Sequence, residues 1–124
     1  MRRVIISGGG TGGHIYPAIT IARAIADIEP TEFLYVGSKI GLENTLIPKE
    51  GLPFLTLDVR GLERKMSVRN LVTLGKTAGS LIKAEGIIHK FKPDVVIGTG
   101  GFVCGPVLLA ASLSGVPTLI QEQN

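Results

Sequence analysis

Two glycine-rich segments contain the residues whose spacing could do chemistry. They are residues 8–14, GGGTGGH, and residues 98–101, GTGG. Each follows a short apolar run and precedes a stretch that can be helical. A glycine-rich turn at a helix N-terminus exposes backbone N–H groups in a positive field, which favours anions. We therefore expect two phosphate-binding turns in one domain, and a ligand that carries phosphate.

His14, which ends the first segment, could transfer a proton. The positive end of a helix disfavours the imidazolium form and leaves a neutral imidazole that can act as a general base. The alternative is a histidine whose ring only caps or packs, and both interpretations stay open from the sequence. His89 lies in a basic helical stretch and is interpreted as a surface residue.

The first segment also matches the dinucleotide fingerprint, with glycines at positions 8, 10 and 13. That fingerprint expects an acidic residue about 20 positions further on, at the end of the second strand. Here the strand ends Val36-Gly37-Ser38, and Glu32 precedes it. The sequence therefore disfavours NAD, and a nucleotide-binding module remains an alternative.

Apolar runs and helical spacing alternate along the chain. The pattern predicts strands over residues 4–6, 33–36, 54–57, 94–97 and 117–120, and helices over 15–28, 42–49, 70–90 and 106–113. Pro17 would lie in the first turn of its helix, and residues 60–69 would form a charged loop. Such alternation predicts an α/β fold, a Rossmann-like parallel sheet with helices on both faces, in one domain over residues 1–124.

Composition narrows the class of protein. The 124 residues include one cysteine, Cys104, which excludes an internal disulfide. No second Cys and no His lies near it, so a small buried thiol is favoured over a nucleophile or a metal ligand. No apolar run reaches the roughly 20 residues that span a bilayer. The apolar run at the N-terminus, Val4-Ile5-Ile6, is too short for the core of a signal peptide. From these features we expect a cytoplasmic protein. We also expect it to be part of a longer protein, because the chain stops just past a strand.

Charge is distributed unevenly. Residues 60–92 hold eight Lys or Arg against two Glu, a net of +6, while the rest holds five against eight, a net of −3. The basic part predicts either an anionic partner surface or an ordinary solvated helix face. Leu71 and Leu74, beside Arg69 and Lys76, could contact a membrane, although core packing is the commoner role of an apolar stripe.

Three blocks together resemble the MurG family, the bacterial peptidoglycan N-acetylglucosaminyltransferases. They are residues 8–18 (GGGTGGHIYPA), 92–101 (KPDVVIGTGG) and 122–124 (EQN), in that order and spacing, and the similarity runs the whole chain. The resemblance implies a GT-B fold of two Rossmann-like domains, of which this chain would be most of the N-terminal acceptor domain. It also implies transfer of GlcNAc, with inversion, from UDP-GlcNAc to the lipid-linked muramoyl-pentapeptide (lipid I), giving lipid II.

The resemblance also assigns roles to residues. His14 would deprotonate the acceptor hydroxyl. The donor would contact Thr11, Gly12, Gly13 and Asn124. The acceptor diphosphate would be held by Gly9, Gly10, Thr99, Gly100 and Gly101. The membrane would be touched by Leu71, Leu74, Arg69 and Lys76. No metal, cofactor or nucleic acid is implied, and the location would be peripheral, on the cytoplasmic face of the membrane.

The chain departs from the family pattern at several positions. Phe102 stands where tyrosine is common, and Gln121 replaces the usual histidine before the final Glu-Gln-Asn. Gly75 and Ala78 stand where larger residues could contact a membrane. Because the UDP-holding domain is missing, we expect the 124 residues alone to be inactive. A non-catalytic, membrane-anchoring subunit of a split glycosyltransferase is the alternative.

Overall fold

The computed structural model describes residues 1–58 and 68–121, and the side chains of residues 1–58 and 78–121. The described residues form one parallel sheet in the order β3-β2-β1-β4-β5. Its strands are β1 (Arg2–Ser7), β2 (Thr31–Ser38), β3 (Phe54–Leu57), β4 (Val95–Gly98) and β5 (Thr118–Ile120). The helices between them are α1 (Gly12–Ile28), α2 (Glu43–Glu50), α3 (Val68–Phe91) and α4 (Cys104–Leu113). The predicted Rossmann-like α/β fold is confirmed.

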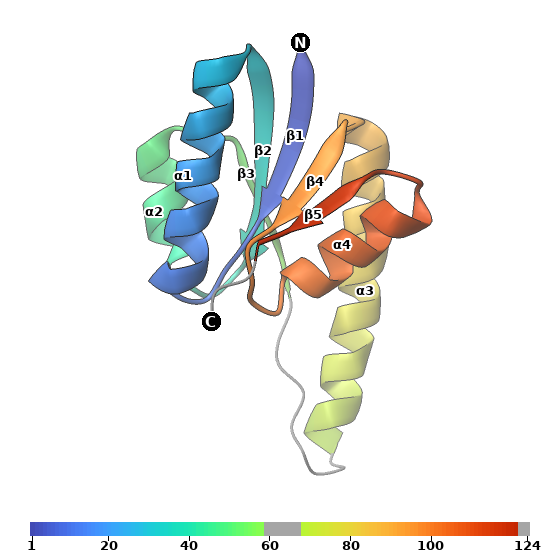
Figure 1. The fold of residues 1–124 in the computed structure, drawn as a ribbon. Coiled ribbons are helices and arrows are strands. Elements are labelled where there is room, and N and C mark those ends of the chain that lie inside the picture. Colours follow the sequence, from blue (N-terminus) through green and yellow to red (C-terminus); the bar gives the residue numbers. More distant parts are fainter. Residues whose placement is uncertain (59–67, 122–124) are drawn as a thin grey trace.

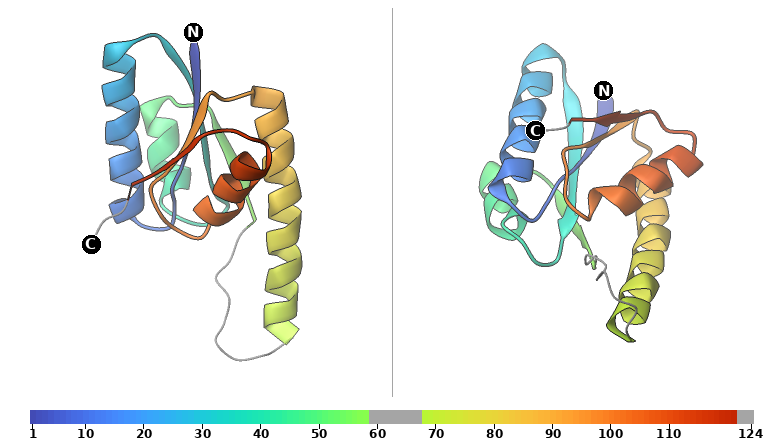
Figure 2. Two further views of the ribbon diagram at one scale, coloured as in Figure 1. Left: turned by 45° about the vertical axis from the view of Figure 1, so that its right-hand side comes forward. Right: turned by 60° about the horizontal axis from the view of Figure 1, so that its bottom comes forward.

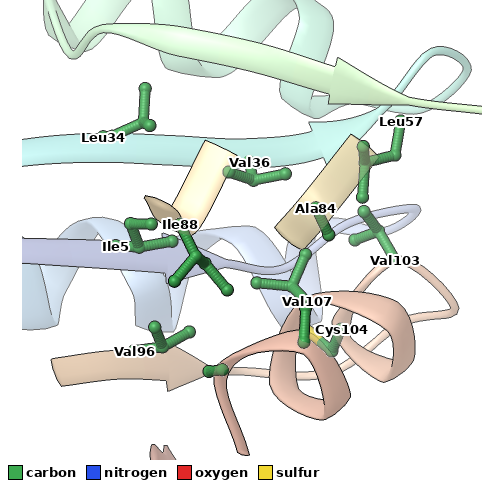
Figure 3. Packing of buried hydrophobic residues seen from close by; sticks show 12 residues of the cluster. Ile5, Leu34, Val36, Leu57, Ala84, Ile88, Val96, Val103, Cys104 and Val107 are labelled. Carbon is green, nitrogen blue, oxygen red and sulfur yellow. The ribbon is translucent and has the colours of Figure 1, made fainter. Parts of the chain in front are cut away.

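Helices cover both faces of the sheet, with α1 and α2 on one side and α3 and α4 on the other (Figure 1). Successive side chains of β1 point to opposite faces, so Val4 and Ile6 pack with α1 and α2 while Ile5 packs with α3 and α4. Figure 3 shows the second of these cores, where Val107 of α4 and Ile88 of α3 meet the strands. Burial on both faces explains why the central strands are continuous apolar runs.

Three helices, α1, α3 and α4, begin earlier than the sequence predicts. α1 starts at Gly12, so Pro17 lies in its second turn and the Gly13 carbonyl receives no N–H from residue 17. α4 starts at Cys104 instead of residue 106. Of the charged loop predicted over residues 60–69, residues 60–67 lie outside the described part, and residues 68 and 69 belong to α3. No helix in the described part is long and apolar enough to cross a bilayer.

Strand register brings the two glycine-rich segments together. Ser7, the last residue of β1, is paired with Gly98, the last residue of β4. The chain therefore leaves both strands at the same level, at the carboxyl edge of the sheet, where α/β folds bind ligands. The described C-terminal residues run back to this edge, whereas the N-terminus lies at the opposite end (Figures 1 and 2).

Candidate functional site

The two glycine-rich segments are hydrogen-bonded to each other. The Gly9 N–H donates to the Gly100 carbonyl (3.1 Å), and the Thr99 N–H donates to the Ser7 carbonyl (2.9 Å). Gly101 has φ +95°, and a Cβ there would collide with the Gly9 backbone. Glycine at position 101 is therefore required both by its conformation and by this close approach. The segments form one site.

His14 is held between the two segments. Its Nδ1 lies 3.0 Å from the Gly9 carbonyl oxygen and 3.4 Å from Thr11 Oγ1. A carbonyl oxygen only accepts, so Nδ1 carries the hydrogen, and in the neutral ring Nε2 keeps its lone pair. The ring lies against Gly100 (φ +118°), where a Cβ would overlap it. This geometry suits a general base, and the catalytic role stays a prediction.

The backbone N–H groups of the first segment divide into two sets. Those of Gly9 and Gly10 are donated inside the protein, to Gly100 and to the Glu43 carboxyl (3.0 Å). Those of Gly12 and Gly13 make no hydrogen bond with any described residue. Both glycines line a hollow of about 810 Å³, together with Tyr16, Pro17, Thr20, Ile21 and Gln121. Gly12 and Gly13, at the N-terminus of α1, therefore lie beside a space that a ligand could enter.

The second segment directs its donors inward. Thr99 is buried, and its Oγ1 donates to the His14 carbonyl (2.6 Å). The Gly100 N–H donates to Cys104 Sγ (3.3 Å). Four of the five residues predicted to hold the acceptor diphosphate thus have their N–H groups taken, and Gly101 alone keeps one without a described partner. The diphosphate contact stays a prediction.

Glu43 is a site residue that the sequence analysis missed. Its side chain is fully buried beneath the first segment, where Oε2 accepts the Gly10 N–H and Oε1 lies 3.0 Å from Ser38 Oγ. The second strand ends without a carboxylate of its own, yet α2 brings one there. A glutamate in the first turn of a short helix ordinarily faces solvent and interacts favourably with the helix dipole. Its position in the sequence therefore did not indicate a role in the site.

Two buried donors hold the ends of the strands below the site. Tyr35 Oη donates to the Gly8 carbonyl (2.6 Å), and burial, with a smaller contribution from Glu43, raises the pKa of Tyr35 far above its usual value. Cys104 Sγ lies 2.9 Å from the Ser7 carbonyl oxygen, and burial raises the pKa of the thiol. Both groups stay protonated at neutral pH and serve as donors. The buried, free thiol predicted from the sequence is confirmed.

Other predicted residues lie outside this constellation. Asn124 is outside the described residues. The backbone of the predicted membrane contacts, Arg69, Leu71, Leu74 and Lys76, belongs to α3, and their side chains are outside the described part. His89 is exposed, as predicted. In the described chain, no three His, Cys, Asp or Glu side chains gather as a metal site.

Comparison with known proteins identifies the family. Residues 4–124 match the glycosyltransferase family 28 N-terminal domain. Relatives from a Thermoanaerobacter species (54% identical) and from Pediococcus pentosaceus (48% identical) each align over 123 residues. Both are named UDP-N-acetylglucosamine–N-acetylmuramyl-(pentapeptide) pyrophosphoryl-undecaprenol N-acetylglucosamine transferase. The alignments cover 98% of this chain and 34% of each relative, so the chain spans about a third of their length.

Solved structures agree with this match. The crystal structure of Acinetobacter baumannii MurG superimposes with a TM-score of 0.87 and 32% identity, covering 100% of this chain and 36% of that one. The S. aureus MnaA structure, solved with UDP, has a TM-score of 0.67 at 16% identity, covering 97% of this chain and 29% of that one. At that identity the likeness to MnaA shows the fold alone.

Proposed function

The chain belongs to glycosyltransferase family 28, and from that premise we propose that it is the acceptor-side domain of an N-acetylglucosaminyltransferase of peptidoglycan synthesis. The donor would be UDP-GlcNAc and the acceptor the undecaprenyl-diphosphate-linked muramoyl-pentapeptide, lipid I, giving lipid II. The relatives' names support both substrates. Those names favour neither of the alternatives, a non-catalytic, membrane-anchoring subunit of a split glycosyltransferase and a nucleotide-binding Rossmann module.

The chemistry that we propose centres on His14. Its neutral Nε2 takes the proton of the acceptor hydroxyl as that oxygen attacks the anomeric carbon of GlcNAc. The bond from that carbon to the UDP oxygen breaks on the opposite face, which inverts the configuration, and UDP leaves with the electron pair. The observation that carries this proposal is the 3.0 Å contact of Nδ1 with the Gly9 carbonyl, which leaves Nε2 free to accept a proton.

The donors at the start of α1 support a place for the sugar nucleotide. The N–H groups of Gly12 and Gly13 stand at the positive end of the helix, and both residues line the hollow described above. In our proposal they contact the donor, together with Thr11, which is exposed beside them. Asn124 would join them.

We further propose that the protein works at the cytoplasmic face of the membrane as a peripheral protein. The proposed lipid-linked acceptor would place the protein at a membrane surface, and the net charge of +6 over residues 60–92 suits anionic lipid. α3 extends past the carboxyl edge of the sheet, the edge that carries the site (Figure 1). Sedimentation with vesicles tests it: binding to anionic vesicles that weakens with salt is expected, and no binding to either anionic or zwitterionic vesicles would contradict it.

The main experiment is a transfer assay on the complete protein encoded by the natural reading frame that contains these residues. With radiolabelled UDP-GlcNAc and a lipid I analogue, we expect label in the lipid product and release of one UDP per transfer. Residues 1–124 alone serve as the control and should be inactive. Absence of transfer by the complete, folded protein, or clear binding of NAD in its place, would refute the proposal.

A further inference from the structure

One peptide group connects Glu43 to His14. The peptide between Gly9 and Gly10 donates its N–H to Glu43 Oε2 (3.0 Å), and its carbonyl oxygen lies 3.0 Å from His14 Nδ1. Because a peptide group is planar and rigid, fixing its N–H also fixes the direction of its carbonyl. The carboxyl group and the imidazole are therefore held at the two ends of one unit.

The chain makes room for this carboxyl group from three segments. A Cβ at Gly9, at Gly37 or at Gly41 would collide with the Glu43 side chain. Gly9 lies in the first glycine-rich segment, Gly37 in β2, and Gly41 in the turn before α2. Burying a carboxyl group costs free energy unless hydrogen bonds compensate, and Gly10 N–H supplies one here. A glutamate that only stabilises the start of a helix through the helix dipole does not need such a buried pocket.

The same peptide would be poorly fixed without the carboxyl group. Gly10 is exposed and has φ +90°, a conformation that glycine adopts and leaves easily. Rotation of this peptide would turn the Gly9 carbonyl away from the imidazole. The ring would then lose the acceptor that keeps its hydrogen on Nδ1.

We propose that Glu43 is a positioning residue for His14, acting through the peptide between Gly9 and Gly10. Its carboxyl oxygen orients and polarises that peptide, which strengthens the carbonyl as an acceptor for Nδ1–H. The neutral ring is thereby kept in the tautomer whose Nε2 can accept a proton. The kinetic part of this inference rests on the proposed function, while the tautomer of His14 does not.

The test uses three variants of the complete protein. Glu43→Met removes the acceptor at similar side-chain length, and Glu43→Gln keeps an oxygen acceptor. Glu50→Gln is the matched control, because Glu50 is exposed and paired only with Arg23 (2.7 Å) in the described part. The ring nitrogens of ¹⁵N-labelled histidine report the tautomer at a pH where the ring is neutral. Steady-state kinetics report kcat and the KM for UDP-GlcNAc.

In Glu43→Met we expect a mixture of His14 tautomers. We also expect kcat to fall by about 10- to 100-fold, as it does when the partner that orients a metal-bound histidine is removed, with little change in KM. Glu43→Gln should keep the Nδ1–H tautomer and most of kcat, and Glu50→Gln should match the wild type. A folded Glu43→Met protein with an unchanged His14 tautomer would overturn the proposal. The proposal would also be overturned if Glu43→Gln lost the Nδ1–H tautomer of His14 as completely as Glu43→Met does.

If Glu43→Met does not fold, the wild type decides the question. A through-hydrogen-bond coupling between the Gly10 amide nitrogen and the Glu43 carboxyl carbon, together with a protonated Nδ1, supports the proposal. Absence of that coupling overturns it. A wild-type protein that shows this coupling and no transfer would refute the proposed function and leave this inference standing.

Discussion

The tetrapeptide Gly-Thr-Gly-Gly occurs twice in this chain, at residues 10–13 and 98–101, and the two copies do different things. In the first copy Thr11 is exposed and α1 begins at the next residue. In the second copy Thr99 is buried, and α4 begins only at Cys104. A helix that starts inside the motif presents its first N–H groups outward. In the second copy, a turn before the helix directs the N–H groups of Thr99 and Gly100 into the protein.

The first copy supplies the groups that could react or bind a ligand, and the second copy holds His14 in place. The first copy provides the N–H groups of Gly12 and Gly13, which donate to no described residue, and leads into His14. The second copy holds His14, through the hydroxyl of Thr99 and the space left at Gly100. Substitutions in the complete protein test this division, and they follow in decreasing order of their predicted consequences.

His14→Ala should lower kcat by about two to four orders of magnitude, the usual contribution of a general base. Binding of UDP-GlcNAc, measured by calorimetry, should change little, because no backbone donor is removed. His89→Ala is the control, since His89 is exposed on α3. Near-normal turnover of His14→Ala would show that His14 is not the general base.

Gly100→Ala should lower kcat by about a hundredfold, because a Cβ at this position displaces the His14 ring and small misplacements of a reacting group are costly. The positive φ should add about 1–3 kcal/mol of destabilisation, measured by urea unfolding. Gly105→Ala is the matched control, since nothing lies within 4 Å of its added Cβ. Equal kcat in the two variants would show that the second segment does not support His14.

Thr99→Val and Thr11→Val compare the two threonines directly. Thr99→Val leaves a buried carbonyl without its 2.6 Å donor and should lower the free energy of unfolding by about 1–3 kcal/mol. Thr11→Val should lower it by less than about 0.5 kcal/mol, because Thr11 is exposed and makes no side-chain cap. Urea unfolding of both variants provides the measurement. Equal losses would erase the distinction between the two copies.

Gly79→Ala sets the baseline for a glycine with no role in the site. It lies in α3 with open space at its Cβ and no positive φ. Alanine should raise the free energy of unfolding by about 0.5–1 kcal/mol and leave kcat unchanged. Destabilisation at this position would mean that the glycine requirement is not specific to the two segments.

The fold was predictable because it depends on local signals. Short β-branched runs such as Val4-Ile5-Ile6 and helical spacing between them define the alternation, and alternation restricts the topology. The start of α1 was misplaced by three residues, because glycines at positions 12 and 13 argue against helix by propensity. Their place at the N-terminus, where N–H groups need no intrahelical partner, overrides that preference.

The site was predictable only in part. The sequence indicated His14 and the two glycine-rich segments, because a glycine-rich turn before a helix can bind an anion and a histidine beside it can transfer a proton. It could not indicate which N–H groups are free, since that depends on hydrogen bonds between segments about 90 residues apart, such as Gly9 with Gly100. Glu43 could not be identified for the same reason. Its pocket is made by Gly9, Gly37 and Gly41, which come from three segments that only the folded chain brings together.

The most direct test of this account is the tautomer of His14 in the wild-type complete protein. Selective ¹⁵N labelling of histidine, at a pH where the ring is neutral, distinguishes a protonated Nδ1 from a protonated Nε2. We predict that Nδ1 carries the hydrogen and donates it to the Gly9 carbonyl, and that the ¹⁵N chemical shift of Nε2 is that of an unprotonated nitrogen. A hydrogen on Nε2 would contradict it, because the ring could then not accept the proton of the acceptor hydroxyl at that nitrogen.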